Sequence, residues 1–319
     1  MNMTNKNPLV AIDCITYNHG KFIRDTLEGF VMQRTDFPFV AIVHDDASTD
    51  GTADIIREYA ERYPDIIKPI LETENLYSKG DDSLGRVMRE AIDASGAKYV
   101  ALCEGDDYWT DPLKLQKQID FMEANPDYSM CFHNAIEHWE NGLVPDAPKN
   151  QNLDDGDFSG IDIYNSYIVP TASIMVRNSV IKNRKYLKAC NSRKFAFGDL
   201  LICLSASDLG KIRYSKEMGS VYRRHENSAT FTDLINPFVL PGSHRYIPRY
   251  FGRKYFVPVR NRIITVYRNL VLANIKARDN KNAVKALRLA VKYDPFYTMY
   301  SFMKYFAWKA MESLRRNEK

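Results

Sequence analysis

Three carboxylates fall within four residues in the stretch CEGDDYW, at Glu104, Asp106 and Asp107. They follow the apolar run AKYVALC, which has the composition of a buried strand. Carboxylates this close repel one another, and a hard divalent cation such as Mn²⁺ or Mg²⁺ would cancel the repulsion by taking oxygen ligands from them. Acidic residues are also common in solvated surface turns. Taken alone, the motif leaves both interpretations open.

A second acidic cluster, Asp45-Asp46, ends the apolar run FVAIVH. Ser48, Asp50 and Thr52, which follow it, are residue types that cap a helix. Capping does not explain why the preceding strand ends in two carboxylates, which could accept hydrogen bonds from a nucleobase or from ribose hydroxyls. Two acidic clusters at neighbouring strand ends favour a shared ligand site over two unrelated surface turns.

Apolar runs alternate with amphipathic stretches through the first hundred residues. Strands are predicted at residues 9–16, 39–46, 66–71 and 97–104, and helices at 21–33, 47–65 and 82–96. This alternation is typical of an α/β fold with a mostly parallel, Rossmann-like sheet flanked by helices. Ligands of such sheets bind at the carboxyl ends of the strands. The polar segments directly after the strands are therefore the ones that could form a site.

The sequence after residue 104 predicts further elements, and its composition becomes basic and aromatic near Pro241. A strand is expected at 128–135, a turn-rich loop at 141–160, and a helix that begins at Gly198-Asp199. Three helices are expected beyond Pro241. We therefore expect a catalytic domain at residues 1–235 and a basic, aromatic-rich helical region at 236–319.

The two regions differ strongly in charge. From Pro241 onward there are 18 Lys/Arg and 4 Asp/Glu, a net charge of +14, whereas the preceding 240 residues carry a net charge of −10. A basic region of this size suggests an anionic partner such as a membrane surface or a phosphorylated acceptor. Packing of its aromatic residues on the acidic domain is an equal alternative. Neither interpretation implies a nucleic-acid partner.

Cysteine usage and hydropathy indicate the compartment. The five cysteines form no CxxC pair, and an odd number of core-type thiols fits a reducing cytoplasm better than a disulfide framework. No run of roughly 18–20 apolar residues predicts a membrane-spanning helix. The first residues lack a basic start followed by a long apolar segment, so we expect no signal peptide. We expect a cytoplasmic protein, and peripheral association with the inner membrane face is one of the two interpretations of its basic region.

Taken in order, six stretches resemble the family 2 glycosyltransferases, which have the type A nucleotide-sugar-binding fold. The stretches are ITYNHGKFI, VHDDASTDGTADII, CEGDDYWTDPLKLQKQIDFM, TASIMVRNSVI, FGDLL and YRRHENS. The chain departs from the family pattern at Ile15, where Pro is common, at Glu104, where Asp is commoner, and at Gly198, where Glu is frequent. None of these changes removes a group that the chemistry needs.

The resemblance implies a role for each matching residue. Thr16, Tyr17 and Asn18 would line the nucleoside pocket, and Asp46 with Asp45 would contact the base or ribose. A Mn²⁺ or Mg²⁺ ion would be held by Asp106, with Glu104 as a second candidate ligand. Asp107 would lie on the nucleotide side and His225 near the diphosphate. Asp199 would act as the catalytic base.

The expected reaction is an inverting, metal-dependent transfer. A sugar would move from a nucleotide-diphosphate sugar, with UDP as the favoured nucleotide, to a hydroxyl of a glycan or lipid-linked acceptor in bacterial surface polysaccharide synthesis. A sugar-1-phosphate nucleotidyltransferase is one alternative, although TYNHGKF is a poor match to a glycine-rich triphosphate loop. A non-catalytic nucleotide-sugar-binding or scaffold protein is the other alternative.

Overall fold

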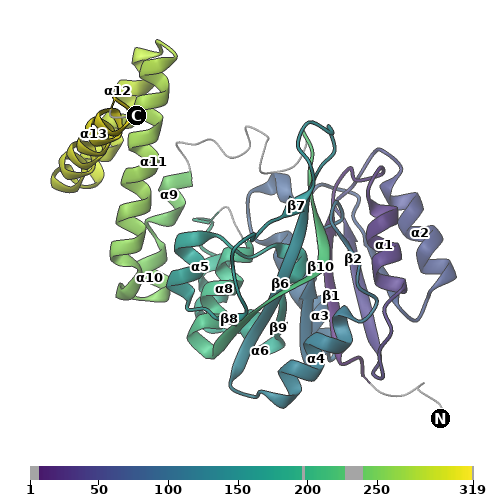
Figure 1. Ribbon diagram of the computed structural model, residues 1–319. Coiled ribbons are helices and arrows are strands. Elements are labelled where there is room, and N and C mark those ends of the chain that lie inside the picture. The colour runs from purple at the N-terminus through teal and green to yellow at the C-terminus, as the bar shows by residue number, and fades with distance from the viewer. Residues whose placement is uncertain (1–6, 196–197, 227–239, 318–319) are drawn as a thin grey trace. The chain divides into compact units, whose positions relative to one another are not determined.

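The computed structural model describes residues 7–195, 198–226 and 240–317. Figure 1 shows the chain as a ribbon. The chain folds into two compact units. The first comprises Met1–Arg193 with Phe197–Ser228, and the second comprises Lys194–Ala196 with Ala229–Lys319. The predicted domain boundary at residues 235–236 lies outside the described residues.

The first unit is organised around one sheet with the strand order β3-β2-β1-β4-β9-β6-β10-β5. Strands β3, β2, β1 and β4 are mutually parallel, β6 and β10 are parallel, and β9 runs antiparallel to both β4 and β6. The strands are β1 (Val10–Thr16), β2 (Phe39–Asp45), β3 (Ile67–Leu71), β4 (Tyr99–Leu102), β5 (Tyr108–Trp109), β6 (Tyr128–Trp139), β7 (Ala147–Pro148), β8 (Gly156–Asp157), β9 (Met175–Arg177) and β10 (Lys211–Arg224).

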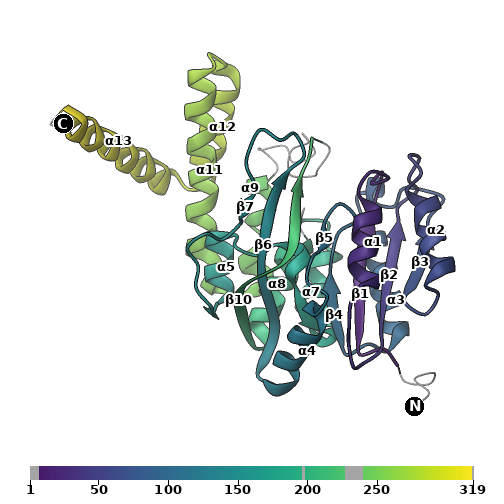
Figure 2. The same cartoon turned by 45° about the vertical axis from the view of Figure 1, so that its right-hand side comes forward.

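Helices cover both faces of this sheet (Figure 2). The helices are α1 (Ile23–Val31), α2 (Thr52–Arg62), α3 (Ser83–Ser95), α4 (Lys114–Ala124), α5 (Gly160–Ser166), α6 (Asn178–Ile181), α7 (Arg184–Cys190) and α8 (Gly198–Leu209). Apolar residues of α1, α2 and α4 form one core with the side chains of β1 that alternate as Val10, Ile12 and Cys14. Helix α3 lies on the opposite face, because it packs on β1 and β2 without contributing to that core.

Most of the predicted elements are confirmed. The strand with Pro69 lies at the sheet edge, where a missing N–H breaks no interior ladder. Two details differ from the sequence prediction. The sequence predicts two separate strands, in KIRY and in MGSVYRR, but the segment 211–224 is one long strand with irregular register between Ser215 and Ser220. The predicted loop at 141–160 contains the short strands β7 and β8, which pair with β6 and β10.

Lys114, at the start of α4, is almost fully buried. Its Nζ lies 4.0 Å from the ring centroid of Trp109 and donates a hydrogen bond of 2.7 Å to Oε1 of Gln118. Burial lowers the pKa of Lys114 from 10.5 to about 7. Between these pH values the unfolded chain binds a proton that the folded chain has released. Stability therefore rises with pH across this range.

We expect Lys114→Met to raise the free energy of unfolding at pH 7 by about 1–3 kcal/mol, because methionine fills the site without desolvating an amine. The advantage should shrink at pH 9, where neutral lysine forms more readily. Chemical denaturation at both pH values measures it. Lys117→Met, on the exposed face of the same helix, serves as the matched control. Equal or lower stability of Lys114→Met at pH 7 would contradict the assignment.

The second unit is helical. Its elements are α9 (Leu240–His244), α10 (Ile247–Phe251), α11 (Phe256–Lys276), α12 (Asn280–Tyr293) and α13 (Pro295–Asn317). Helix α11 packs against both α12 and α13. The three predicted C-terminal helices are thus confirmed. Among the described residues, no helix has both the length and the hydropathy needed to cross a bilayer.

Candidate active site

The carboxyl ends of β1, β2 and β4 meet at one edge of the sheet. Thr16 pairs in register with Asp45, and the N–H of Asp46 donates to the carbonyl of Thr16 at 3.0 Å. The N–H of Gly105 donates to the carbonyl of Ile15 at 2.9 Å. A Cβ on Gly105 would lie 2.5 Å from the side chain of Thr16, so only glycine allows this approach. The parallel sheet therefore brings both acidic clusters to one edge.

The three carboxylates of the acidic turn have different surroundings. Asp107 is 1% exposed, and its Oδ1 accepts a hydrogen bond of 2.9 Å from the backbone N–H of Arg223 in β10. Asp106 lies beside two histidines. Glu104 stays largely exposed, and its charged neighbours include Asp199. Asp107 and Asp106 therefore have different partners, on β10 and in a pair of histidines, whereas the charged neighbours of Glu104 are other carboxylates.

Burial and mutual repulsion shift the protonation of two of these groups. Burial raises the pKa of Asp107 well above its ordinary range, and the charges of Asp106 and Glu104 add to this effect. Its Oδ2 has no hydrogen-bond partner among the described residues. Partial burial, followed by the charges of Asp106, Asp199 and Asp13, also raises the pKa of Glu104. Both shifts favour the protonated form, whereas the pKa of Asp106 is lowered, so Asp106 keeps its negative charge most readily of the three.

His19, Asp106 and His225 form a cluster that could hold a metal ion. One ligand atom of each lies within 4.8 Å of the others. Nε2 of His225 is 3.0 Å from Oδ2 of Asp106, and Nε2 of His19 is 3.9 Å from the same oxygen. Nδ1 of His19 is buried without a hydrogen-bond partner among the described residues. An imidazole with an unused ring nitrogen beside a carboxylate suits a metal ion.

The electrostatic surroundings of this cluster favour the protonation state that binds a metal ion, with a neutral imidazole and an ionised carboxylate. Burial lowers the pKa of His19, against the pull of Asp106, so the ring is neutral at pH 7 and has a lone pair to offer. Burial alone would raise the pKa of Asp106. The hydrogen bond to His225 and the nearby His19 outweigh burial and hold that pKa below its ordinary value. The cluster thus combines an anionic carboxylate with at least one neutral imidazole.

Arg223 connects the acidic turn to α1 and to His225. Its Nη1 donates to the carbonyl of Asp106 at 3.1 Å, and its guanidinium forms an ion pair with Asp25 of α1. The side chain of Arg223 is nearly buried, whereas that of Asp25 is more than half exposed, so only the arginine side of this ion pair is shielded from water. Because His225 follows two residues later, the contacts of Arg223 fix where that imidazole lies.

The residues predicted to line a nucleoside pocket hold three loops together. Asn18, at a positive φ of 53°, donates its N–H to Oγ of Ser48. The carboxylate of Asp45 accepts the N–H of Ser48 at 3.1 Å. The carboxylate of Asp46 accepts two backbone N–H groups, from Leu76 at 2.6 Å and from Tyr77 at 3.0 Å. Their contact with a nucleoside stays a prediction, while their structural role is direct.

Thr16 and Tyr17 differ in accessibility. Thr16 is 1% exposed, with its Oγ1 buried and lacking a hydrogen-bond partner among the described residues, whereas Tyr17 is 47% exposed. Tyr17 is therefore able to meet a planar ligand such as a base. Thr16 fixes the close approach of Gly105 to the first strand.

Asp199 lies in the first turn of α8 and is half-buried. Burial raises its pKa, while the N–H of Leu200 and the charge of Lys149 oppose the rise. A raised pKa brings a carboxylate closer to the neutral range in which a general base is effective. The charge of Asp199 also acts on Glu104, which places Asp199 on the Glu104 side of the acidic turn.

Sequence reasoning named Asp106 and His225 but missed His19. The signal was present, because His19 lies in the polar segment that directly follows the first strand. Glu104, predicted as a metal ligand, lies outside the histidine cluster.

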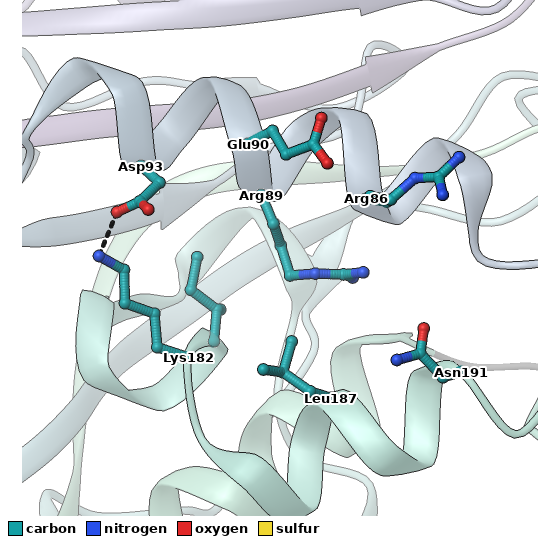
Figure 3. A pocket seen from close by; sticks show the side chains of 8 residues that line it. Arg86, Arg89, Glu90, Asp93, Lys182, Leu187 and Asn191 are labelled. Atoms are coloured by element: carbon teal, nitrogen blue, oxygen red, sulfur yellow. Dashed lines mark hydrogen bonds and ion pairs between the residues drawn. The ribbon is translucent and has the colours of Figure 1, made fainter.

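A cavity of about 320 Å³ lies away from these strand ends, between α3 and the segment of α6 and α7 (Figure 3). Its lining mixes basic and acidic side chains, and Lys182 forms an ion pair with Asp93 across it. None of the predicted site residues lines it. The chemistry we describe therefore belongs to the strand ends.

The mostly parallel, helix-flanked sheet with acidic strand ends has the architecture of the type A glycosyltransferase fold. The chain belongs to glycosyl transferase family 2, whose family model matches residues 14–182. Structural comparison agrees on the fold. S. aureus TarS 1-349 in complex with UDP-GlcNAc has a TM-score of 0.53 at 15% identity, covering 87% of this chain and 90% of that one.

A second structural neighbour is the mannosyltransferase PcManGT from Pyrobaculum calidifontis in complex with GDP-Man and Mn²⁺. It has a TM-score of 0.53 at 16% identity, covering 98% of this chain and 86% of that one.

Sequence relatives cover parts of the chain. An uncharacterized protein of Mycobacterium tuberculosis, Rv1520, is 44% identical over 133 residues, 42% of this chain and 37% of the relative. A putative teichuronic acid biosynthesis glycosyltransferase of Bacillus subtilis, TuaG, is 33% identical over 38% of this chain and 44% of the relative. The dTDP-rhamnosyl transferase RfbG of Shigella flexneri is 24% identical over 67% of this chain and 72% of the relative. The matched region thus spans less than half of the length of the first two relatives.

Proposed function

We propose that the protein is an inverting, metal-dependent glycosyltransferase that moves a sugar from a nucleotide-diphosphate sugar to a hydroxyl of a glycan or lipid-linked acceptor. The cluster of His19, Asp106 and His225 at the strand ends is the observation that carries this proposal. The family assignment favours it over a sugar-1-phosphate nucleotidyltransferase. The relative named for teichuronic acid biosynthesis supports a role in surface polysaccharide synthesis, and the structural neighbour in complex with UDP-GlcNAc makes UDP the first nucleotide to test.

The residues present fit a divalent transition-metal ion. Asp106 offers a carboxylate oxygen, and His19 and His225 offer ring nitrogens. Mg²⁺ prefers oxygen ligands alone, whereas imidazole suits transition metals. We therefore expect Mn²⁺ to be preferred over Mg²⁺. When bound, such an ion neutralises the diphosphate and makes it a better leaving group.

The side chains of the chain supply the remaining steps. Asp199 accepts the proton of the acceptor hydroxyl, whose oxygen then bonds to the anomeric carbon as the bond to the diphosphate breaks. A single displacement of this kind inverts the anomeric centre. Arg223 holds the Asp106 backbone and positions His225. Tyr17, which is exposed beside the first strand, would stack on the base.

A donor screen tests the proposal. The full chain is incubated with UDP-, GDP- and dTDP-sugars in the presence of Mn²⁺ or Mg²⁺, and nucleotide release is measured together with thermal stabilisation. We expect one nucleotide class to stabilise the protein, and to do so more strongly with Mn²⁺. The absence of any metal-dependent stabilisation by a nucleotide would favour the scaffold alternative.

The contribution of His19 can be measured without turnover. We expect His19→Ala to weaken Mn²⁺ binding by at least about tenfold, the lower bound found when even the outer-shell partners of metal ligands are removed. Titration calorimetry with Mn²⁺ gives the affinity directly. The matched control is His138→Ala, which removes a histidine of β6 that pairs with Asp146. Equal Mn²⁺ affinity of His19→Ala and the unmodified protein would exclude His19 as a ligand.

A further inference from the structure

Helix α12 buries its small side chains and exposes its larger apolar ones. The buried residues are Ala283, Ala286 and Ala290, whereas the exposed ones are Val284, Leu287 and Val291. The exposed residues follow one another at intervals of three and four, so they form a single stripe along the helix. In a helix of a soluble protein the larger apolar residues normally face the core. The amphipathic pattern of α12 is therefore inverted.

Helix α13 shows the same inversion over a greater length. Thr298 and Ser301 are 3% and 6% exposed, and Arg268 of α11 donates a hydrogen bond of 3.0 Å to Oγ of Ser301. On other sides of the helix, Phe296 is 81% exposed and Met303 is 64% exposed. The further exposed side chains are Met299, Tyr300, Phe306, Trp308 and Met311. Helix α13 thus turns its small polar side toward α11 and leaves its large apolar residues uncovered.

Basic residues accompany these apolar stripes. On α12, Lys281, Arg288 and Lys292 are exposed, and the helical period places them beside the stripe and opposite the buried alanines. On α13, Lys304 and Lys309 are exposed. Residues 241–319 carry 18 Lys/Arg against 4 Asp/Glu. The apolar surface is therefore set in strongly positive surroundings.

We propose that the helical unit docks on the surface of an anionic phospholipid membrane, with α13 lying in the plane of the interface. A bilayer offers apolar chains beneath negatively charged headgroups, which complements an apolar stripe bordered by cations. Trp308 and Tyr300 are aromatic residues of the kind that settle at the headgroup level. Because no described helix can span a bilayer, α13 lies on the membrane rather than across it.

Vesicle sedimentation of the full-length protein tests this docking. We expect binding to vesicles that contain phosphatidylserine, weak binding to neutral phosphatidylcholine vesicles, and loss of binding at high salt. The double variant Met299→Glu/Met303→Glu should bind anionic vesicles at least about tenfold more weakly, because it removes two apolar contacts and adds repulsion. The matched control is Leu143→Glu/Val144→Glu, which changes two exposed apolar residues of the first unit.

A second variant tests the charges independently of the apolar face. Lys281→Glu/Lys292→Glu should weaken binding to anionic vesicles at least about tenfold, since each substitution removes a cation that the surface attracts and adds an anion that it repels. Circular dichroism confirms that each variant folds. Equal vesicle binding of the unmodified protein and both variants would overturn the proposal. The proposal would also be overturned if the unmodified protein failed to bind vesicles and instead self-associated. Light scattering would measure this self-association, and Met299→Glu/Met303→Glu would abolish it.

Discussion

Asp199→Asn is expected to lower kcat by about 10²- to 10⁴-fold while leaving the affinity for the nucleotide-sugar donor nearly unchanged. Asparagine has the size of aspartate and can still accept the hydrogen bond from the N–H of Leu200, so the start of α8 should be preserved. What it lacks is a basic oxygen that can take the proton of the acceptor hydroxyl. Steady-state kinetics and donor titration separate the two effects.

The pH dependence gives a second readout for Asp199. Burial raises its pKa, and the base works only when it is deprotonated. The acidic limb of kcat should therefore rise at a higher pH than the ordinary aspartate value of 3.8 would allow. Asp208→Asn, at the far end of α8, is the matched control, and we expect it to keep full activity. Retention of more than about a tenth of kcat by Asp199→Asn would show that another group is the base.

Asp106→Asn is expected to abolish metal-dependent nucleotide binding and to lower kcat/KM by about 10³-fold, because metal assistance supplies several kcal/mol. Asparagine leaves the two histidines without the anionic partner of the cluster. The change keeps the backbone carbonyl to which Arg223 donates, so the fold of the turn should persist. Calorimetry with Mn²⁺, alone and with nucleotide, measures the loss.

Asp107→Asn is the informative comparison for Asp106→Asn. Asp107 is buried, its pKa is raised, and its Oδ1 accepts the backbone N–H of Arg223. Asparagine imitates the protonated form, so Mn²⁺ affinity should change little. If the contact with the nucleotide side that the sequence predicts is formed, nucleotide affinity should fall in this variant. Equal loss of Mn²⁺ binding in both variants would contradict the division of roles within the turn.

The sequence alone determined the layered architecture of the first unit. Alternating apolar and amphipathic stretches report burial through local periodicity, so β1, α1, β2, α2, α3 and β4 could be predicted without tertiary information. The edge position of β3 agrees with Pro69, because a proline in an interior strand would interrupt the hydrogen-bond ladder. The long strand β10 could not be predicted in one piece, because its irregular register beside β6 depends on pairing between segments distant in sequence.

The candidate residues Asp106, Asp199 and His225 were also found from the sequence, through the family motifs and the rule that ligands bind at strand ends. The sequence did not predict which of these residues lie close together. His19 joins the cluster only because the loop after β1 and the end of β10, about two hundred residues later, reach the same carboxylate. Distances of this kind are set by strand register and by the close approach of Gly105 to Thr16, which no local pattern encodes.

Charge shows the same division. The sequence established that residues 241–319 are basic and that three carboxylates crowd one turn. Only the tertiary structure decided that Asp107 points to the backbone of β10, Asp106 to the histidines, and the large apolar residues of α13 away from α11. The physical reason is that a side chain's type is local information, whereas its burial and partners depend on where the rest of the chain packs.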